Sequence, residues 1–140
     1  MRYGSRVGGV FRFVEHVGEV EVEIEASTPA AVLEEAVGAV AALLSTENSS
    51  GGPRATHEVT VAGRDLPALL PGLVDELVFL ADTEGFLPLA GEATIEGLTA
   101  RVTVSGVVGR PAPLVKAATL HRLLLEPGNG GWRGRVVLDV

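Results

Sequence analysis

Apolar and polar residues alternate along several short stretches of the chain, a pattern typical of half-buried β-strands. Over residues 19–26, valine, isoleucine and alanine alternate with four glutamates. This segment predicts a strand with an acidic outer face, on which we expect Glu21, Glu23 and Glu25 to be solvated. Near the end of the chain, Trp132, Val136 and Leu138 fall on one side of a second alternation. Arg133, Arg135, Val137 and Asp139 fall on the other side.

Two longer segments have apolar residues at helical spacing. In the first, Thr28 is a good N-cap, Pro29 suits the first helical position, and the apolar stripe ends around Ser45. In the second, Asp65 can cap a helix that runs to about residue 82. Pro71 should kink this helix or mark a break near its start, because proline lacks an amide donor and crowds the preceding turn.

The segment after residue 85 predicts only strands. These cover residues 86–89, 93–96 and 98–104, with turns at Gly91 and Gly97, and a last pair that starts at Leu114 and turns at residues 127–131. The order of elements predicts an α+β fold, a two-layer sandwich in which two helices pack on one face of a mixed, largely antiparallel sheet. We expect one domain over residues 1–140, with residues 1–9 as a flexible arm.

Composition narrows the classes of function. The 140 residues include no cysteine, so there is no thiolate metal site and no cysteine nucleophile. No apolar run approaches the ~18 residues that span a bilayer, which predicts a soluble, cytoplasmic protein without membrane contact. Eighteen acidic against eleven basic residues give a net charge of −7, which opposes direct binding to nucleic acid and favours a protein partner with a basic face.

The last two residues place two carboxylates close together, the side chain of Asp139 and the terminal carboxylate of Val140. Such a pair repels itself unless a cation or a basic group lies between, so a metal or Lys116 is the natural partner. Lys116 is the single lysine beside ten arginines, which is consistent with a need for a compact ammonium or with chance. The alternative for the terminus is a frayed tail with a solvated Asp139.

Other candidate residues lie elsewhere in the chain. Glu19 is the first residue of its predicted strand, directly after Gly18 and three residues after His16. The three histidines share no metal-ligand spacing, so we expect His16 and His121 to pack near the site and His57 to be an ordinary strand residue.

Asp82 and Glu84 close the second helix. Acids at the negative end of a helix dipole are poorly placed for stability, which hints at function, although an exposed helix end can tolerate them. The sequence contains neither a phosphate-binding loop followed by Lys and Ser/Thr nor a Gly-x-Ser-x-Gly elbow. A pair of catalytic carboxylates among Glu15, Glu19, Asp82, Glu84 and Asp139 stays open.

Three segments together resemble the archease family. Residues 115–121 read VKAATLH and lead, through a turn, to the ending RVVLDV at residues 135–140. Residues 15–20 read EHVGEV, similar to the family's N-terminal motif, which usually has His-Thr-Ala-Asp and an aliphatic residue. Residues 75–85 read DELVFLADTEG and are similar to the family's second-helix motif. The three segments come in the family order at family-like separations.

The resemblance implies an accessory protein, not itself an enzyme, that serves an RtcB-type RNA ligase in tRNA splicing and RNA repair. Such proteins promote guanylylation of the ligase and its repeated turnover, and meet RNA only indirectly. Carried over to this chain, Glu19 and Asp139 hold a divalent cation with a main-chain or terminal oxygen of Val140. Lys116 lies beside them and meets the ligase or its nucleotide, with His16, His121, Asp82 and Glu84 nearby.

Glu19 departs from the family pattern, which normally has Asp at this position. The extra methylene moves the carboxylate outward by about one bond length. Ca²⁺ tolerates this more readily than Mg²⁺, which demands near-octahedral geometry. We therefore expect Ca²⁺, with Mg²⁺ or Mn²⁺ as the other candidates.

Two other classes of function stay open. One is a chaperone-like adaptor, in which a metal merely pins the terminus. The other is a metal-dependent hydrolase of phosphoesters, which a cluster of carboxylates would permit.

Overall fold

The fold consists of two helices between two antiparallel sheets. The computed structural model describes residues 3–6, 9–45 and 51–140. Its elements, in chain order, are β1 (Tyr3–Arg6), β2 (Gly9–His16), β3 (Glu19–Ala26), α1 (Pro29–Leu44), β4 (Arg54–Ala62), α2 (Leu69–Glu84), β5 (Phe86–Glu96), β6 (Thr99–Val108), β7 (Ala117–Gly128) and β8 (Gly131–Asp139). The strands form a five-stranded sheet in the order β1-β2-β3-β8-β7 and a three-stranded sheet in the order β4-β6-β5.

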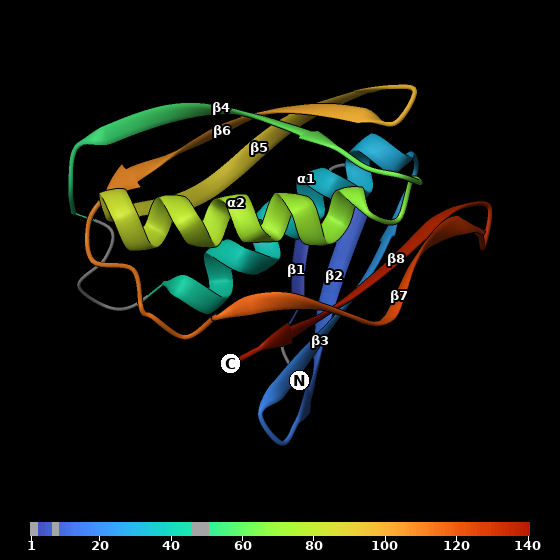
Figure 1. The fold of residues 1–140 in the computed structure, drawn as a ribbon, viewed down its shortest axis with the longest axis horizontal. Helices are drawn as coiled ribbons and strands as arrows, with labels where there is room; N and C mark the ends of the chain where they lie inside the picture. Colours follow the sequence, from blue (N-terminus) through green and yellow to red (C-terminus); the bar gives the residue numbers. More distant parts are fainter. Residues whose placement is uncertain (1–2, 7–8, 46–50) are drawn as a thin grey trace.

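Both helices contact both sheets (Figure 1). Helix α1 packs against β2 and β3 on one side and against β5 on the other, while α2 packs against β7, β4 and β5. The predicted α+β class, with two helices packed on antiparallel strands, is confirmed. The strands divide into two sheets where we expected one, and all pairings between described strands are antiparallel. The reason is that α1 is apolar on nearly every side and therefore needs cover on two faces.

Three predicted boundaries differ from the structure. The predicted flexible arm is wrong for Tyr3–Arg6, which pairs with β2 as strand β1, while residues 1–2 and 7–8 lie outside the described part of the chain. Gly91 is not a turn but lies within the long strand β5. The strand expected from Leu114 begins at Ala117.

The ends of α1 follow the sequence signals closely, whereas α2 begins at Leu69, later than the predicted cap at Asp65. The Thr28 hydroxyl accepts a hydrogen bond from the Ala31 amide at 3.0 Å, and α1 ends before Ser45. Asp65 caps the turn that precedes α2, accepting from the Ala68 amide at 3.0 Å. Pro71 is the third residue of α2, where its missing amide hydrogen leaves no intrahelical bond unmade. None of the described helices has the length and apolar character needed to cross a lipid bilayer.

A glycine in each sheet lets α1 approach closely. A Cβ atom at Gly134 of β8 would lie 2.6 Å from Val32 Cγ1, and one at Gly91 of β5 would lie 2.9 Å from Val37 Cγ2. Both valines are fully buried in α1. The two glycines therefore set the distance between the helix and the sheets on either side of it.

Strand β7 carries a long bulge, residues 120–123, that crosses the outer face of the five-stranded sheet. Thr119 lies opposite Val137 and Leu124 opposite Arg135, so four residues of β7 stand where β8 has one. The Arg122 backbone has φ 53°, a conformation that non-glycine residues rarely adopt. The bulge spans β8 and reaches β3, because Arg122 Nε donates to Glu21 Oε1 at 2.9 Å.

The bulge buries residues that would otherwise face solvent. Val137 and Glu21 point to the outer face, yet they are only 2% and 3% exposed. The prediction that Glu21 is solvated is therefore wrong, because the local alternation of β3 gives no sign of a cover from β7. Glu23 is half-buried and forms an ion pair with Arg12, and Glu25 is exposed as expected.

Glu21 is held in its charged form. Burial by itself would raise the pKa of Glu21. A hydrogen bond with the Glu23 side chain, the hydrogen bond and charge of Arg122, and the charge of Arg135 outweigh it and hold the pKa below the usual value of 4.5. The Glu21 carboxylate therefore anchors the β7 bulge to β3 at neutral pH.

Substitution of Gly134 tests the close approach of α1. We expect Gly134→Ala to lower the free energy of unfolding by about 1–3 kcal/mol, because the new methyl group overlaps a β-branched side chain held in a helix. Urea denaturation of the natural protein and the variant measures the change in the free energy of unfolding. Gly51→Ala is the matched control, since a Cβ there meets no atom within 4 Å. A loss at Gly134 no larger than at Gly51 would contradict the proposed role.

Substitution of Glu21 tests the anchor of the bulge. A carboxylate with a lowered pKa stabilises the fold above its unfolded pKa, and this stabilisation is lost as the pH falls through the folded pKa. We therefore expect Glu21→Gln to be less stable than the natural protein by about 1–3 kcal/mol at pH 7. The difference should shrink as the pH falls below 4.5.

The exposed Glu25→Gln variant is the control and should change stability by less than about 0.5 kcal/mol. Thermal or urea unfolding of the three proteins between pH 3 and 7 makes the comparison. A difference between Glu21→Gln and the natural protein that does not depend on pH would show that the Glu21 charge has no part in the anchor.

Candidate functional site

The candidate site is the carboxylate corner, defined here as Glu19, Asp139 and Val140 with the backbone of Lys116. Glu19 begins β3, Asp139 ends β8, and the antiparallel register sets them directly opposite each other. Residues paired in this way project on the same face with Cβ atoms about 4.5–5.5 Å apart. His16 of β2 and Ala117 of β7 continue the same row on either side of the two acids.

Backbone hydrogen bonds fix the rest of the corner. The Val140 amide donates to the Gly18 carbonyl at 3.1 Å, so the chain after β8 lies against the β2–β3 turn. The Lys116 amide donates to the Asp139 carbonyl at 2.8 Å, which holds the start of β7 beside the end of β8. Val140 is half-buried and packs against the core, which excludes the frayed tail considered from the sequence.

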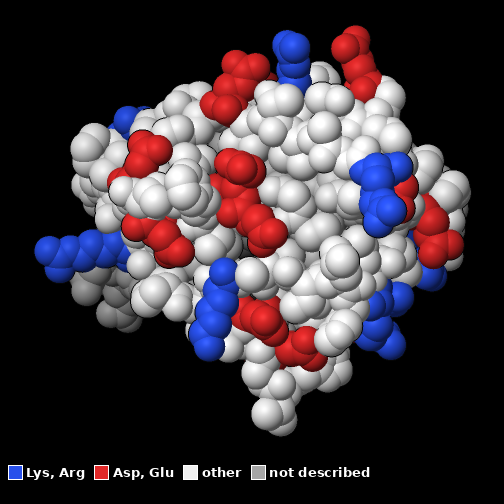
Figure 2. All heavy atoms as spheres, viewed as in Figure 1, with Lys and Arg blue, Asp and Glu red and all other residues white. Residues whose placement is uncertain are grey.

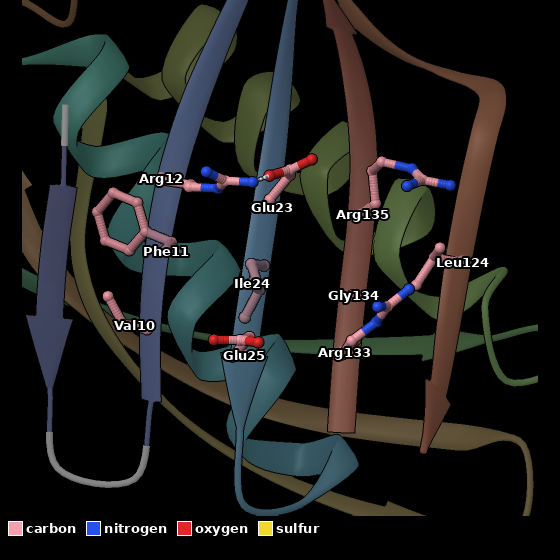
Figure 3. A pocket seen from close by; sticks show the side chains of 10 residues that line it. All are labelled: Val10, Phe11, Arg12, Glu23, Ile24, Glu25, Leu124, Arg133, Gly134 and Arg135. Atoms are coloured by element: carbon pink, nitrogen blue, oxygen red, sulfur yellow. Dashed lines mark ion pairs between the residues drawn. The ribbon is translucent and has the colours of Figure 1, made fainter. Parts of the chain in front are cut away.

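The pairing of two acids sets this row apart from the others on the same face. Moving along the sheet, Glu23 lies opposite Arg135 and Glu25 opposite Arg133. Figure 3 shows these rows, with the ion pair between Arg12 and Glu23.

Among the described strand pairings, Glu19 and Asp139 are the only two carboxylates that face each other. Like charges directly opposite each other destabilise a sheet by a few tenths to about 1 kcal/mol. The corner therefore has a local excess of negative charge that a cation would relieve.

A hollow of about 370 Å³ lies over the acid–base rows, away from the corner. Its lining includes Arg12, Glu23, Glu25, Arg133 and Arg135 but neither Glu19 nor Asp139. Three arginines and two glutamates line this hollow, so it lacks the excess of negative charge that would favour a cation.

The histidines are placed in different ways. His121, carried by the β7 bulge, has Nδ1 at 3.5 Å from Glu19 Oε2. The Nε2 atom of His16 is 4.0 Å from Glu21 Oε1. His57 is a residue of β4, as expected, and its ring lies edge-on to Phe86. His121 is thus the histidine in direct reach of the corner, and the long bulge explains how a residue of β7 contacts β3.

Helix α2 is tied to the start of β7 at a different residue from the two we expected near the corner. Asp82 and Glu84 lie at its C-terminal end, where Glu84 Oε1 is 3.9 Å from His57 Nε2 in the three-stranded sheet. The residue of α2 that contacts the start of β7 is Asp75, whose Oδ1 accepts a hydrogen bond from the Ala118 amide at 2.9 Å. Sequence reasoning missed this role, and the one signal for Asp75 was its place at the start of the second-helix motif.

The ligand chemistry of the corner is that of a hard cation. Within the described part of the chain, no three His, Asp or Glu side chains converge to form a complete metal site. A cation here would therefore use two side-chain carboxylates and main-chain oxygen, which suits Ca²⁺ or Mg²⁺ and not Zn²⁺. Figure 2 shows carboxylates gathered where α2 crosses the face, and the exposed acids of α2 are Asp75, Glu76, Asp82 and Glu84. Of these, Asp82 and Glu84 lie at the end of α2 near His57 and do not belong to the corner.

Comparison with known proteins shows relatives over nearly the whole chain. The family model described as "Archease protein family (MTH1598/TM1083)" matches residues 11–140. The chain is 26% identical to the protein archease of Methanosarcina mazei, covering 95% of this chain and 97% of that one. It is 29% identical to the protein archease of Pyrobaculum islandicum, with 93% and 95% covered.

Two solved structures have a similar fold. The solution structure of protein 1598 of Methanobacterium thermoautotrophicum superposes with a TM-score of 0.66 at 23% identity, covering 93% of this chain and 98% of that one. The crystal structure of a Thermotoga maritima archease, described as a "possible chaperone", gives a TM-score of 0.65 at 20% identity, with 91% and 94% covered. Since the family model spans nearly the whole sequence, the chain belongs to the archease family.

Proposed function

We propose that this protein activates an RtcB-type RNA ligase by promoting the guanylylation and repeated turnover of the ligase, with a divalent cation held at the carboxylate corner. Glu19, Asp139 and a main-chain oxygen of Val140 are the proposed ligands, and Ca²⁺ is the proposed ion. Membership of the archease family supports the ligase as partner. The single observation that carries the site is the register pairing of Glu19 with Asp139.

The surroundings of the corner support this assignment of ligands. Two strands and the backbone bond from Val140 to Gly18 hold the ligands, so little conformational entropy is lost when an ion binds. Glu19 reaches from the strand end through its longer side chain, and its side chain is one-third exposed. An ion at this edge would be accessible to a partner and would supply positive charge to orient phosphate or carboxylate oxygens.

Residues around the corner have supporting roles in the proposal. The backbone of Lys116 is tied to Asp139, and its exposed side chain places an ammonium on the rim for a partner or its nucleotide. His121 contacts Glu19 and orients its carboxylate. Asp75 holds the start of β7 through the Ala118 amide and so keeps the Lys116 segment in place.

A chaperone-like adaptor is the second candidate function. The Thermotoga maritima structure with the same fold is described as a "possible chaperone". On that hypothesis the cation would only tie down the end of β8, and the clients would be unrelated proteins. Assays of ligase activation and of client aggregation distinguish the two functions.

Neutralisation of Asp139 tests the cation site. Without a divalent ion, we expect Asp139→Asn to be more stable than the natural protein by a few tenths to about 1 kcal/mol, because two opposed charges become one. Ca²⁺ should raise the melting temperature of the natural protein through binding to the folded state. The variant should lose this shift, and its Ca²⁺ affinity in calorimetric titration should fall at least about tenfold.

The control for this experiment is Glu96→Gln. Glu96 is also an exposed carboxylate at a strand end, but it lies opposite the neutral Thr99. Its substitution should leave the Ca²⁺ response unchanged. An equal response to Ca²⁺ in the natural protein and in Asp139→Asn would remove the corner as the binding site.

A guanylylation assay tests the proposed activity. Purified RtcB-type ligase, GTP and metal are incubated with and without this protein, and guanylylated ligase and joined RNA are measured over time. We expect the natural protein and Glu96→Gln to increase both, and Asp139→Asn to do so at least about tenfold less. No stimulation by the natural protein would reject the ligase proposal, and rescue of unrelated aggregating proteins would then favour the adaptor.

A further inference from the structure

Two apolar side chains project into solvent next to the carboxylate corner. Among the described residues, the most exposed large hydrophobic side chains are Val17, which is fully exposed, and Leu120, which is 74% exposed. The other exposed large hydrophobic side chains are between 39% and 59% exposed. Single exposed apolar residues are common, so their position has to decide whether they matter.

Both residues flank Glu19. Val17 is in the two-residue turn between β2 and β3, two positions before Glu19, and the next residue, Gly18, binds the Val140 amide. Leu120 is in the β7 bulge and directly precedes His121, which contacts Glu19 at 3.5 Å. Each apolar residue is therefore the chain neighbour of a residue that contacts the corner, one on the turn and the other on the bulge.

The backbone holds these side chains in fixed positions. Gly18 has φ 74°, as a tight hairpin turn requires. Beyond Leu120, Arg122 is held by Glu21, and its carbonyl accepts a hydrogen bond from Arg135 Nε at 2.7 Å. A fixed backbone reduces the entropy that two exposed side chains lose when they are buried by a partner.

Local backbone geometry does not require apolar residues at these positions. Tight turns favour Gly, Asn, Asp and Ser, and a β-branched valine has no conformational advantage there. At Leu120, the bulge is held by its Arg122 contacts and not by the leucine side chain, which is largely in solvent. A role in contact with another molecule explains both residues.

We propose that Val17 and Leu120 are the apolar contacts through which the carboxylate corner docks onto a protein partner whose surface combines an apolar recess with basic groups. The whole chain carries a net charge of −7, which favours a partner surface with basic groups. Complementary charge accelerates and orients such an encounter, while buried apolar side chains lower the dissociation rate. The same negative charge opposes anionic lipid and nucleic acid as occupants.

This inference rests on the proposed function, because it takes the RtcB-type ligase as the partner that the corner meets. It adds that docking and cation binding use different residues. Variants at Val17 and Leu120 should therefore weaken the complex while the cation site stays intact.

The test compares a double variant with a matched control. Val17→Ser with Leu120→Ser removes both apolar contacts. The control, Leu98→Ser with Leu89→Ser, removes two leucines of the other sheet that are each 43% exposed. Leu98 lies in the β5–β6 turn beside Gly97, as Val17 lies in the β2–β3 turn beside Gly18. Binding of each protein to purified ligase is measured by calorimetry in the presence of Ca²⁺, together with Ca²⁺ affinity, melting temperature and stimulation of guanylylation.

We expect the double variant to bind the ligase about 10- to 100-fold more weakly, the range for loss of central interface contacts, with unchanged Ca²⁺ affinity and melting temperature. Stimulation of the ligase should recover at high concentrations of the variant. The control should bind as the natural protein does. Ligase binding unchanged by the double variant, or weakened equally by the control, would overturn the proposal.

Three further outcomes would show that a molecule other than the ligase covers Val17 and Leu120, or that the ligase is not the partner. If the natural protein self-associates in sedimentation experiments and the double variant does not, the occupant is a second copy of this chain and the proposal is overturned. Binding to anionic vesicles that the double variant loses would overturn it in favour of a membrane surface. Absence of any ligase binding by the natural protein with normal Ca²⁺ binding would reject the ligase as partner, and the docking proposal with it.

Discussion

The antiparallel register between β3 and β8 is the constraint on which the site depends. It sets Glu19 opposite Asp139, while the following rows set glutamate opposite arginine or valine. A shift of one residue would turn every side chain of β3 to the opposite face, so this register is also required to bury Val20, Val22 and Ile24. The register that buries the apolar face also brings the two carboxylates together, and the core stabilises an arrangement that is electrostatically unfavourable without a counter-ion.

Helix α1 makes that register possible by filling the space between the two sheets. It contacts β3 and β8 on one side and β5 on the other, with Gly134 and Gly91 at the close approaches. Because α1 is apolar nearly all round, it stabilises both sheets at once. The carboxylate corner lies at the end of the sheet, so its residues can serve a partner without disturbing this packing.

The β7 bulge connects the rigid sheet with the exposed rim. The bulge is anchored by the ion pair of Arg122 with the buried Glu21. It covers part of the outer face of β3, which the sequence alternation predicts to be exposed to solvent. The bulge also carries His121 to Glu19 and leaves Leu120 exposed. One irregular segment therefore contributes to the stability of the sheet, to the surroundings of the proposed ligands and to the proposed docking surface.

The sequence by itself determined most of the elements and the candidate residues of the corner. Thr28 and Pro29 identified the start of α1 correctly, because capping depends on a few neighbouring residues. Alternation identified β3 and β8, and the motifs at both ends of the chain identified Glu19, Asp139, Lys116 and Val140, which the register then brought together.

Only the tertiary structure decided how distant segments cover one another. It divided the strands into two sheets and placed Gly91 against α1 in the middle of a strand. It also buried Glu21 beneath the β7 bulge, whose Arg122 is 101 positions away in the sequence. It also separated Asp82 and Glu84, at the end of α2, from Asp75, which reaches the Lys116 segment. Local patterns record which side of an element is apolar, but the partner that covers a given side is set by packing among elements far apart in the chain.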